Sequence, residues 1–236
     1  MTERESLSAN DGLLLPAIRV ETAKSPEWSV VWLHGLGADG HDFEPIVNEL
    51  DTDSLPGIRF IFPHAPMRPV TINGGFVMRA WYDITSPDFS QRREDERGVR
   101  ESAGQIEALI ARENALGIAD DHIVLAGFSQ GGAIALHTGL RHTQRLAGVL
   151  ALSTYLPLVD TLTAEANTAN RDVPIFMAHG HGDTVIPYEM GLRSSELLKT
   201  QGYPLTWHPY FAEHTVCMEE LRDIETWLHE ILGGTT

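Results

Sequence analysis

HIVLAGFSQGGAIALH, residues 122–137, contains a serine in the pattern Gly-x-Ser-x-Gly and decides the fold of the chain. Residues 122–126 form an apolar run that is typical of a buried strand, and residues 131–142 have a helical composition. A strand–turn–helix of this kind presents its serine at the top of a sheet, at a helix N-terminus whose dipole favours negative charge. We therefore predict that Ser129 is a nucleophile. The alternative is an ordinary glycine-rich turn in which Ser129 only caps the helix.

The same alternation of apolar runs and helical patterns continues along the rest of the chain. Strands are expected at 28–33, 58–62, 122–126, 146–152 and 173–177, with a weaker strand at 205–210 and an antiparallel edge strand at 17–21. Helices are expected at 43–50, 99–110, 131–142, 187–200 and 216–232. Repeated strand–helix alternation predicts a mostly parallel central sheet with helices on both faces.

Two segments interrupt this alternation. Residues 69–81 contain Asn73-Gly74-Gly75 between apolar residues, which predicts a hairpin or a tight excursion. Residues 155–172 are polar and show no clear period. Because ligands bind beyond the carboxyl ends of parallel strands, both segments are candidates to wall a pocket. We expect residues 1–12 to be a flexible N-terminal tail and residues 13–234 to form a single domain.

Composition excludes several classes of function. The 17 Lys and Arg against 33 Asp and Glu give a formal charge of −16, which argues against binding nucleic acid or an anionic membrane. The single cysteine, Cys217, allows no internal disulfide and fits a reducing compartment. No secretory signal is evident, and no apolar run is long enough for stable membrane insertion. We expect a cytoplasmic protein.

A serine nucleophile needs a histidine base, and the histidine needs an orienting carboxylate. In α/β-hydrolases these residues follow in the order Ser, Asp or Glu, His. Asp183 follows the strand expected at 173–177, and His214 lies between the strand ending near Tyr210 and the last helix. We therefore predict the triad Ser129, Asp183 and His214. The rival candidates lack such a position: Asp160, Asp172, His208 and His229.

The segment His179-Gly-His181-Gly-Asp183 also admits a metal-binding interpretation. The pattern H-x-H-x-D resembles the signature of metallo-β-lactamase-type hydrolases, in which a further His normally follows the Asp. Here that position is Thr184. Cys217 is a second rival nucleophile, but no strand–turn–helix presents it, and a buried thiol is expected instead. We therefore predict no metal and no cofactor.

A tetrahedral intermediate requires N–H donors that are already in place. One donor comes from the residue after the nucleophile, which is Gln130. The other is expected in the loop after an early strand. The strand at 28–33 runs directly into His34-Gly-Leu36-Gly, where glycines on both sides let the Leu36 amide turn toward the site. We assign the oxyanion hole to Leu36 and Gln130. The alternative is an ordinary glycine-rich loop capped by Asp39.

Together, these segments resemble the carboxylesterase/acyl-protein thioesterase (lysophospholipase-like) family of α/β-hydrolases, and most of all its bacterial carboxylesterases. The matching segments are WLHGLGADGHDF, FPHAPMRPVTINGG, AWYDI, AGFSQGGAIALHT, ALSTYLP and HGHGDTVIPYEMG. They lie between residues 32 and 191. The resemblance implies the same triad and oxyanion hole. It also implies a hydrophobic acyl site formed by Leu36, Trp81 and Leu156.

One departure from the family concerns the histidine loop. The family usually has Met-Gly-His, whereas this chain has Ala212-Glu213-His214, which can alter loop flexibility and the environment of the histidine. The resemblance implies a serine hydrolase that acts through an acyl-enzyme intermediate on short- to medium-chain carboxylic esters, acyl-thioesters or lysophospholipids. A non-catalytic small-molecule binding module on the same scaffold is the alternative function. The resemblance therefore implies a small ester or an acylated molecule as the substrate, and it leaves a homodimer open, because the family includes homodimers.

Overall fold

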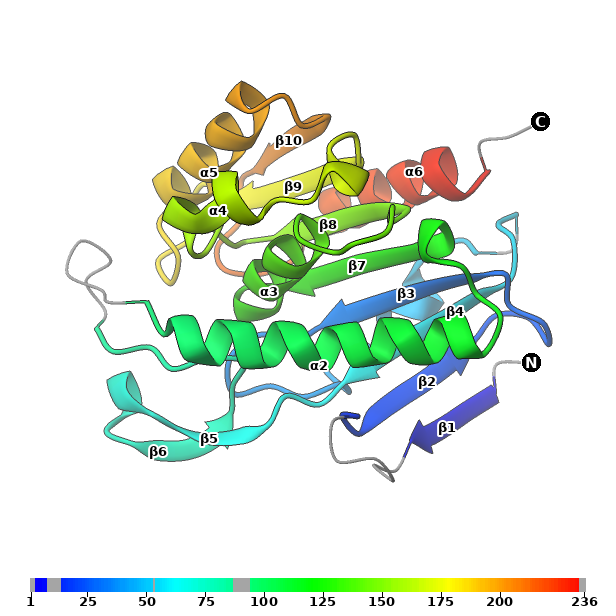
Figure 1. Ribbon diagram of the computed structural model, residues 1–236, viewed down its shortest axis with the longest axis horizontal. Coiled ribbons are helices and arrows are strands. Elements are labelled where there is room, and N and C mark those ends of the chain that lie inside the picture. Colours follow the sequence, from blue (N-terminus) through cyan, green and yellow to red (C-terminus); the bar gives the residue numbers. More distant parts are fainter. Residues whose placement is uncertain (1–2, 8–13, 53, 87–93, 234–236) are drawn as a thin grey trace.

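The structure is a computed structural model that describes residues 3–7, 14–52, 54–86 and 94–233. Within these residues a twisted eight-stranded sheet forms the centre of the molecule (Figure 1). Its strands, in spatial order, are β1 (Glu3–Leu7), β2 (Ala17–Glu21), β4 (Ile58–Pro63), β3 (Trp28–Leu33), β7 (Ile123–Phe128), β8 (Gly148–Leu152), β9 (Ile175–Gly180) and β10 (Leu205–Tyr210). The run from β4 to β10 is parallel, and β2 pairs antiparallel with both β4 and β1.

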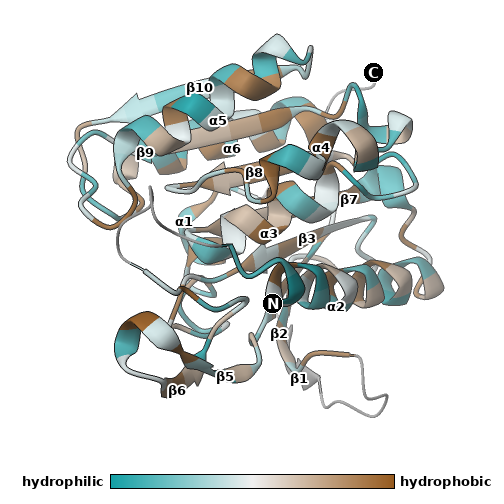
Figure 2. Ribbon diagram, turned by 60° about the vertical axis from the view of Figure 1, so that its left-hand side comes forward, coloured by the Kyte–Doolittle hydropathy of each residue, from teal (hydrophilic) through white to brown (hydrophobic). Residues whose placement is uncertain are grey.

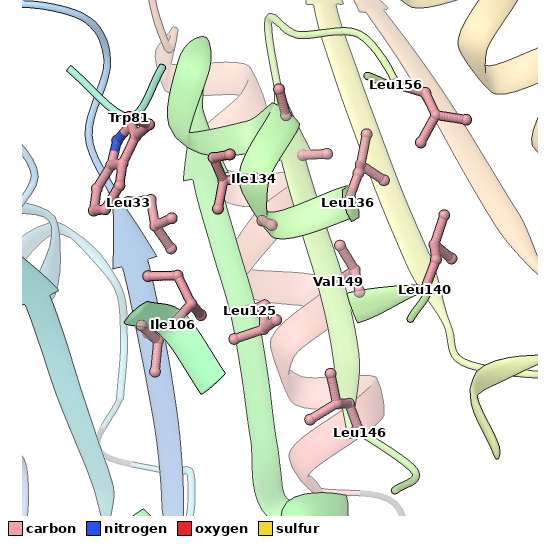
Figure 3. Packing of buried hydrophobic residues seen from close by; sticks show 14 of the residues in the cluster. Leu33, Trp81, Ile106, Leu125, Ile134, Leu136, Leu140, Leu146, Val149 and Leu156 are labelled. Carbon is pink, nitrogen blue, oxygen red and sulfur yellow. The ribbon is translucent and has the colours of Figure 1, made fainter. Parts of the chain in front are cut away.

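Helices cover both faces of the sheet (Figure 1). One face carries α2 (Glu96–Ala115), α3 (Gln130–Gly139), α4 (Val159–Glu165) and α5 (Tyr188–Thr200), and the other carries α1 (Ile46–Glu49) and α6 (Met218–Gly233). Side chains of a strand alternate between these faces, so Val31 and Leu33 join the first apolar cluster, whereas Val30 and Trp32 join the second. This double burial explains why the central strands are continuously apolar. Figure 3 shows the first cluster packed between β3, β7, β8 and the helices.

Most predicted elements are confirmed, with shifted ends. The strand expected from residue 122 begins at Ile123, because Asp120–His122 form a 3₁₀ turn. The strand expected at 173–177 begins at Ile175, after Pro174, which has no N–H for a sheet ladder. The first helix shrinks from the expected 43–50 to Ile46–Glu49. The fold class is the predicted one, a mostly parallel sheet between two helical layers.

The edge of the sheet differs from the prediction. The strand Ala17–Glu21 is antiparallel as expected, but β1 (Glu3–Leu7) pairs with its outer side and forms the edge. These residues fall inside the range 1–12 that we expected to be a tail, and the rest of that range lies outside the described residues. An edge strand is held by backbone hydrogen bonds. It therefore needs no apolar period that a sequence pattern could reveal.

The two interrupting segments are each structured. The hairpin is confirmed: β5 (Met67–Val70) and β6 (Phe76–Arg79) pair antiparallel around a 3₁₀ turn at Thr71–Asn73, and Gly74 has a φ of 67°. It projects at the end of the molecule to which the β3 and β7 arrowheads point (Figure 1), and its ribbon includes hydrophobic residues (Figure 2). Among them, the Phe76 side chain is exposed. The polar segment at 155–172 contains the short helix α4 and a 3₁₀ turn at Thr168–Asn170.

Candidate active site

Ser129 lies in a strained turn between β7 and α3. Its φ of 56° and ψ of −122° are conformations that non-glycine residues rarely adopt, and strain of this kind concentrates at functional sites. The neighbouring glycines make the turn sterically feasible. A Cβ on Gly127 would lie 2.3 Å from the Gly131 carbonyl carbon, and a Cβ on Gly131 would lie 2.3 Å from the Leu33 oxygen. The turn therefore requires glycine on both sides of the serine.

Three side chains from distant parts of the chain form one hydrogen-bonded series. The Ser129 hydroxyl lies 3.0 Å from His214 Nε2, and His214 Nδ1 lies 2.7 Å from Asp183 Oδ2. Asp183 follows β9, whereas His214 follows β10 and precedes α6. A carboxylate can only accept, so Nδ1 carries the hydrogen and Nε2 is free to accept the serine proton. The Phe128 ring packs 4.6 Å from the imidazole and limits its movement.

Asp183 is held in its ionised form. Its Oδ1 accepts hydrogen bonds from the backbone N–H groups of Val185 at 2.9 Å and Ile186 at 2.8 Å. Burial raises the pKa of this carboxyl, but hydrogen bonds from His179, His214 and the backbone outweigh burial and hold the pKa far below its usual value. A carboxylate fixed through both oxygens can keep His214 in one orientation and tautomer.

The predicted oxyanion donors, Leu36 and Gln130, lie at the same cavity as the serine. Among the described residues no hydrogen bond uses the backbone N–H of Leu36 or Gln130. The Gln130 N–H is the first of α3 and has no acceptor within the helix. Its side chain is anchored separately: Oε1 accepts from the Trp81 N–H at 3.0 Å, and Nε2 donates to the Tyr82 carbonyl at 2.9 Å.

His34 orients the Leu36 amide. Its Nε2 accepts from the Ala65 N–H at 3.1 Å, so the hydrogen is on Nδ1, which donates to the Gly35 carbonyl at 2.7 Å. Burial lowers the pKa of His34 to about 4, which keeps the imidazole neutral and preserves this tautomer. In a trans peptide the C=O and N–H point in opposite directions. Fixing the Gly35 carbonyl therefore directs the Leu36 N–H away from His34.

An apolar cavity of about 360 Å³ adjoins the serine. Its apolar and aromatic walls come from the loop after β3, the β5–β6 hairpin and the loops after β6, β8 and β9: Leu36, Ile72, Tyr82, Ile84, Tyr155 and Ile186. The hydroxyls of Tyr82 and Tyr155 form a hydrogen bond of 2.9 Å across it. A site of this kind accepts an apolar group next to the serine hydroxyl.

Two of the three expected acyl-site residues are not on the cavity wall. Trp81 is fully buried and donates its indole N–H to the His34 carbonyl at 2.8 Å. Leu156 is 2% exposed, and both pack into the core (Figure 3). Only Leu36 of that set lines the cavity. Their neighbours in the chain, Tyr82 after Trp81 and Tyr155 before Leu156, line the cavity instead. The sequence pattern indicates the right segments, but outside a regular strand or helix it does not indicate which of two adjacent residues lines a cavity.

The remaining candidates have other surroundings. His179 is buried behind Asp183, and the His181 ring packs against Tyr188 at 4.3 Å. Across the described ranges there is no group of three or more His, Cys, Asp or Glu arranged to hold a metal ion. His208 stacks on Phe176 at 4.3 Å, and Cys217 is half-buried rather than buried as expected. Among all the residues that the structure describes, no helix is both long and apolar enough to cross a membrane.

These features define the class of protein. A mostly parallel sheet carries a serine at a strained strand-to-helix turn, with an aspartate and a histidine from the ends of later strands, in the chain order Ser, Asp, His. This combination is that of an α/β-hydrolase. The chain belongs to the phospholipase/carboxylesterase family, whose profile matches residues 16–232. The protein is therefore a hydrolase.

Individual relatives agree with this family. Acyl-protein thioesterase 1 of Neurospora crassa is 41% identical over 236 residues, which is 96% of this chain and 94% of the relative. Acyl-protein thioesterase 1 of Yarrowia lipolytica is 36% identical over 219 residues, 91% of this chain and 96% of the relative. Among solved structures, Arabidopsis thaliana SOBER1 superposes with a TM-score of 0.82 at 32% identity, covering 87% of this chain and 99% of that one.

Proposed function

We propose that the protein is a serine esterase that cleaves carboxylic esters and acyl-thioesters through an acyl-enzyme intermediate. The observation that carries this proposal is the series Ser129 Oγ, His214 Nε2, His214 Nδ1 and Asp183 Oδ2, joined by contacts of 3.0 and 2.7 Å beside an apolar cavity. A neutral imidazole between a hydroxyl and an ionised carboxylate is the arrangement that activates a serine. The family and its thioesterase members support the same reaction.

Acylation proceeds from this geometry. His214 Nε2 takes the proton of Ser129 as Oγ bonds to the acyl carbonyl carbon, and the carbonyl oxygen becomes an oxyanion. The backbone N–H groups of Leu36 and Gln130 donate to that oxygen, and each such donor is worth about 10²- to 10³-fold in rate. Asp183 stabilises the imidazolium. Collapse of the intermediate breaks the bond to the leaving alcohol or thiol, which takes the proton from His214.

Deacylation repeats these steps with water. His214 removes a proton from a water molecule as its oxygen attacks the acyl carbonyl on Ser129. The second oxyanion uses the same two donors. Collapse then releases the carboxylic acid and returns the proton to Ser129. The protein's own residues supply every proton transfer, so this route includes no metal or cofactor.

The apolar cavity supports substrates that carry an apolar acyl group, which the cavity would recognise. Its walls are mainly aliphatic and aromatic, and its volume of about 360 Å³ suits a short- to medium-chain acyl group. The relatives' name, acyl-protein thioesterase, supports acyl-thioesters, including those on proteins, as substrates. Lysophospholipids carry the same acyl ester. Hydrolysis rates for p-nitrophenyl esters of increasing chain length, measured beside an acyl-thioester, would rank these substrates.

Substituting the nucleophile tests the proposal. Purified Ser129→Ala should keep its fold and lose p-nitrophenyl butyrate hydrolysis. Ser195→Ala is the matched control, because Ser195 is equally buried but lies on α5 and donates to the Leu192 carbonyl. It should retain wild-type turnover. Equal activity of Ser129→Ala and wild type would reject the proposal, and absence of turnover in the wild type would favour the non-catalytic binding module.

A further inference from the structure

His179 is a second histidine that contacts the carboxylate of Asp183, in addition to His214. Its Nε2 lies 3.3 Å from Asp183 Oδ2 and 2.9 Å from the Ile186 carbonyl oxygen, and the side chains of His179 and Asp183 are fully buried. Both neighbours of Nε2 are acceptors, so Nε2 must carry a hydrogen. Nδ1 has no hydrogen-bond partner among the described residues. The ring therefore adopts the neutral Nε2–H tautomer, which leaves no buried N–H unpaired.

The surroundings of His179 fix the ring in this orientation. A Cβ on Gly191 of α5 would lie 2.3 Å from Nδ1, so the imidazole occupies space that only a glycine leaves open. The rings of Tyr188 and Trp207 pack at 6.1 and 6.2 Å. A ring enclosed on these sides cannot turn its donor away from Asp183. Packing of this kind is what holds a supporting residue of an active site in place.

We propose that His179 is a positioning residue for the esterase reaction, acting through Asp183. Its Nε2–H is shared between the Ile186 carbonyl oxygen at 2.9 Å and, as the longer contact, Oδ2 at 3.3 Å, the same oxygen that accepts from His214 Nδ1. It also holds the Ile186 carbonyl, while the Ile186 N–H donates to Oδ1. His179 therefore fixes the carboxylate and the turn that supports it. The inference rests on the proposed function, because it assigns a role within the same triad.

This arrangement has an electrostatic consequence for His214. The negative charge on Oδ2 is shared between two donors, which weakens its attraction for a protonated His214. Without the donor from His179, the carboxylate faces His214 alone and stabilises the imidazolium more strongly. The acid limb of the kcat/KM profile then moves to higher pH. A freed carboxylate also orients His214 less well, which lowers kcat rather than raising KM.

Two amide variants of His179 separate its hydrogen bond to Asp183 from its packing in the core. In His179→Gln the side-chain amide nitrogen reaches the place of Nε2 and keeps a donor to Asp183. In His179→Asn the amide nitrogen reaches only the place of Nδ1. Asparagine also leaves a larger void than glutamine, so the separating readout is the position of the acid limb, which a void alone would not move. His137→Gln is the control, since His137 is also buried but lies on α3 and makes no hydrogen bond to the triad within the described residues.

The measurement is kcat and KM for p-nitrophenyl butyrate from pH 5 to 9. We expect His179→Asn to lose about tenfold in kcat, the effect of one hydrogen bond to a charged group, with the acid limb about half a unit higher. His179→Gln should recover most of both, and His137→Gln should leave the acid limb unchanged. Equal profiles for the Gln and Asn variants would overturn the role of His179. Because all variants retain Ser129, that outcome would leave the esterase assignment standing, whereas an active Ser129→Ala would not.

Discussion

Glu220 predicts a measurable pH dependence of stability. Its carboxyl lies in the first turn of α6 and is 1% exposed. One oxygen accepts from the Cys217 N–H at 3.4 Å, and the other has no hydrogen-bond partner among the described residues. Burial, together with the nearby charge of Asp223, raises the pKa of Glu220 from 4.5 to about 8. The folded protein therefore keeps this group protonated at neutral pH.

The sign and size of the effect follow from linkage. A folded-state pKa above the unfolded value means that the stabilisation is fully present below pH 4.5 and is lost as the pH rises to about 8. At 1.36 kcal/mol per unit, a shift of about 3.5 units corresponds to about 5 kcal/mol over that window. Within it, Glu220 lowers the free energy of unfolding by about 1.4 kcal/mol for each pH unit.

Glu220→Gln tests this directly, because glutamine is the neutral isostere and does not titrate. The free energy of unfolding is measured by urea titration with tryptophan fluorescence, for wild type and variant, from pH 5 to 8. Subtracting the free energy of unfolding of wild type from that of the variant at each pH cancels the contributions of the other titrating groups. We expect the variant to gain about 4 kcal/mol relative to wild type across these three units. Glu219→Gln, an exposed change in the same turn, should show no such gain. Parallel curves for wild type and Glu220→Gln would refute the reasoning.

Three further outcomes are expected. Gly131→Ala should lower kcat about 100-fold, because its Cβ would lie 2.3 Å from a backbone oxygen of β3 and displace the serine turn; ester kinetics would test this. Asp183→Asn should lower kcat about 10⁴-fold with little change in KM, since the amide favours the wrong tautomer of the base. Burial lowers the pKa of His142, but hydrogen bonds to Glu107 and Asp120 outweigh it and raise the pKa. Wild-type stability should therefore fall as the pH rises above 6.5, and His142→Gln should flatten this decline in urea titrations.

The sequence predicts those parts of the structure in which a local requirement, such as burial or close backbone approach, restricts the residue types at consecutive positions. A strand buried on both faces is almost continuously apolar, so the apolar run Trp28–Leu33 predicts its strand directly. The serine turn requires glycine at Gly127 and Gly131, which makes the motif specific. Chain order and position after late strands predict Asp183 and His214, and the structure brings both within hydrogen-bonding distance in series with Ser129.

Other features depend on contacts between distant segments and leave no local pattern. The helix α4 is short and polar, and it is held by Glu165, which pairs with Arg100 of α2 at 2.6 Å and with Arg141 at 2.8 Å. Of the two adjacent residues after β6, Tyr82 lines the cavity, whereas Trp81 is fully buried. These relations exist only in the folded chain. A period of hydrophobic residues therefore cannot reveal them.

The central claim is that Ser129 becomes acylated. The most direct measurement is reaction of the purified protein with a fluorophosphonate, followed by mass spectrometry of the intact chain and of its peptides. The account predicts one adduct per chain, located on Ser129 and absent from Ser129→Ala and from wild type that was unfolded first. An adduct on any other residue, or active ester turnover by a protein that forms no adduct, would contradict it.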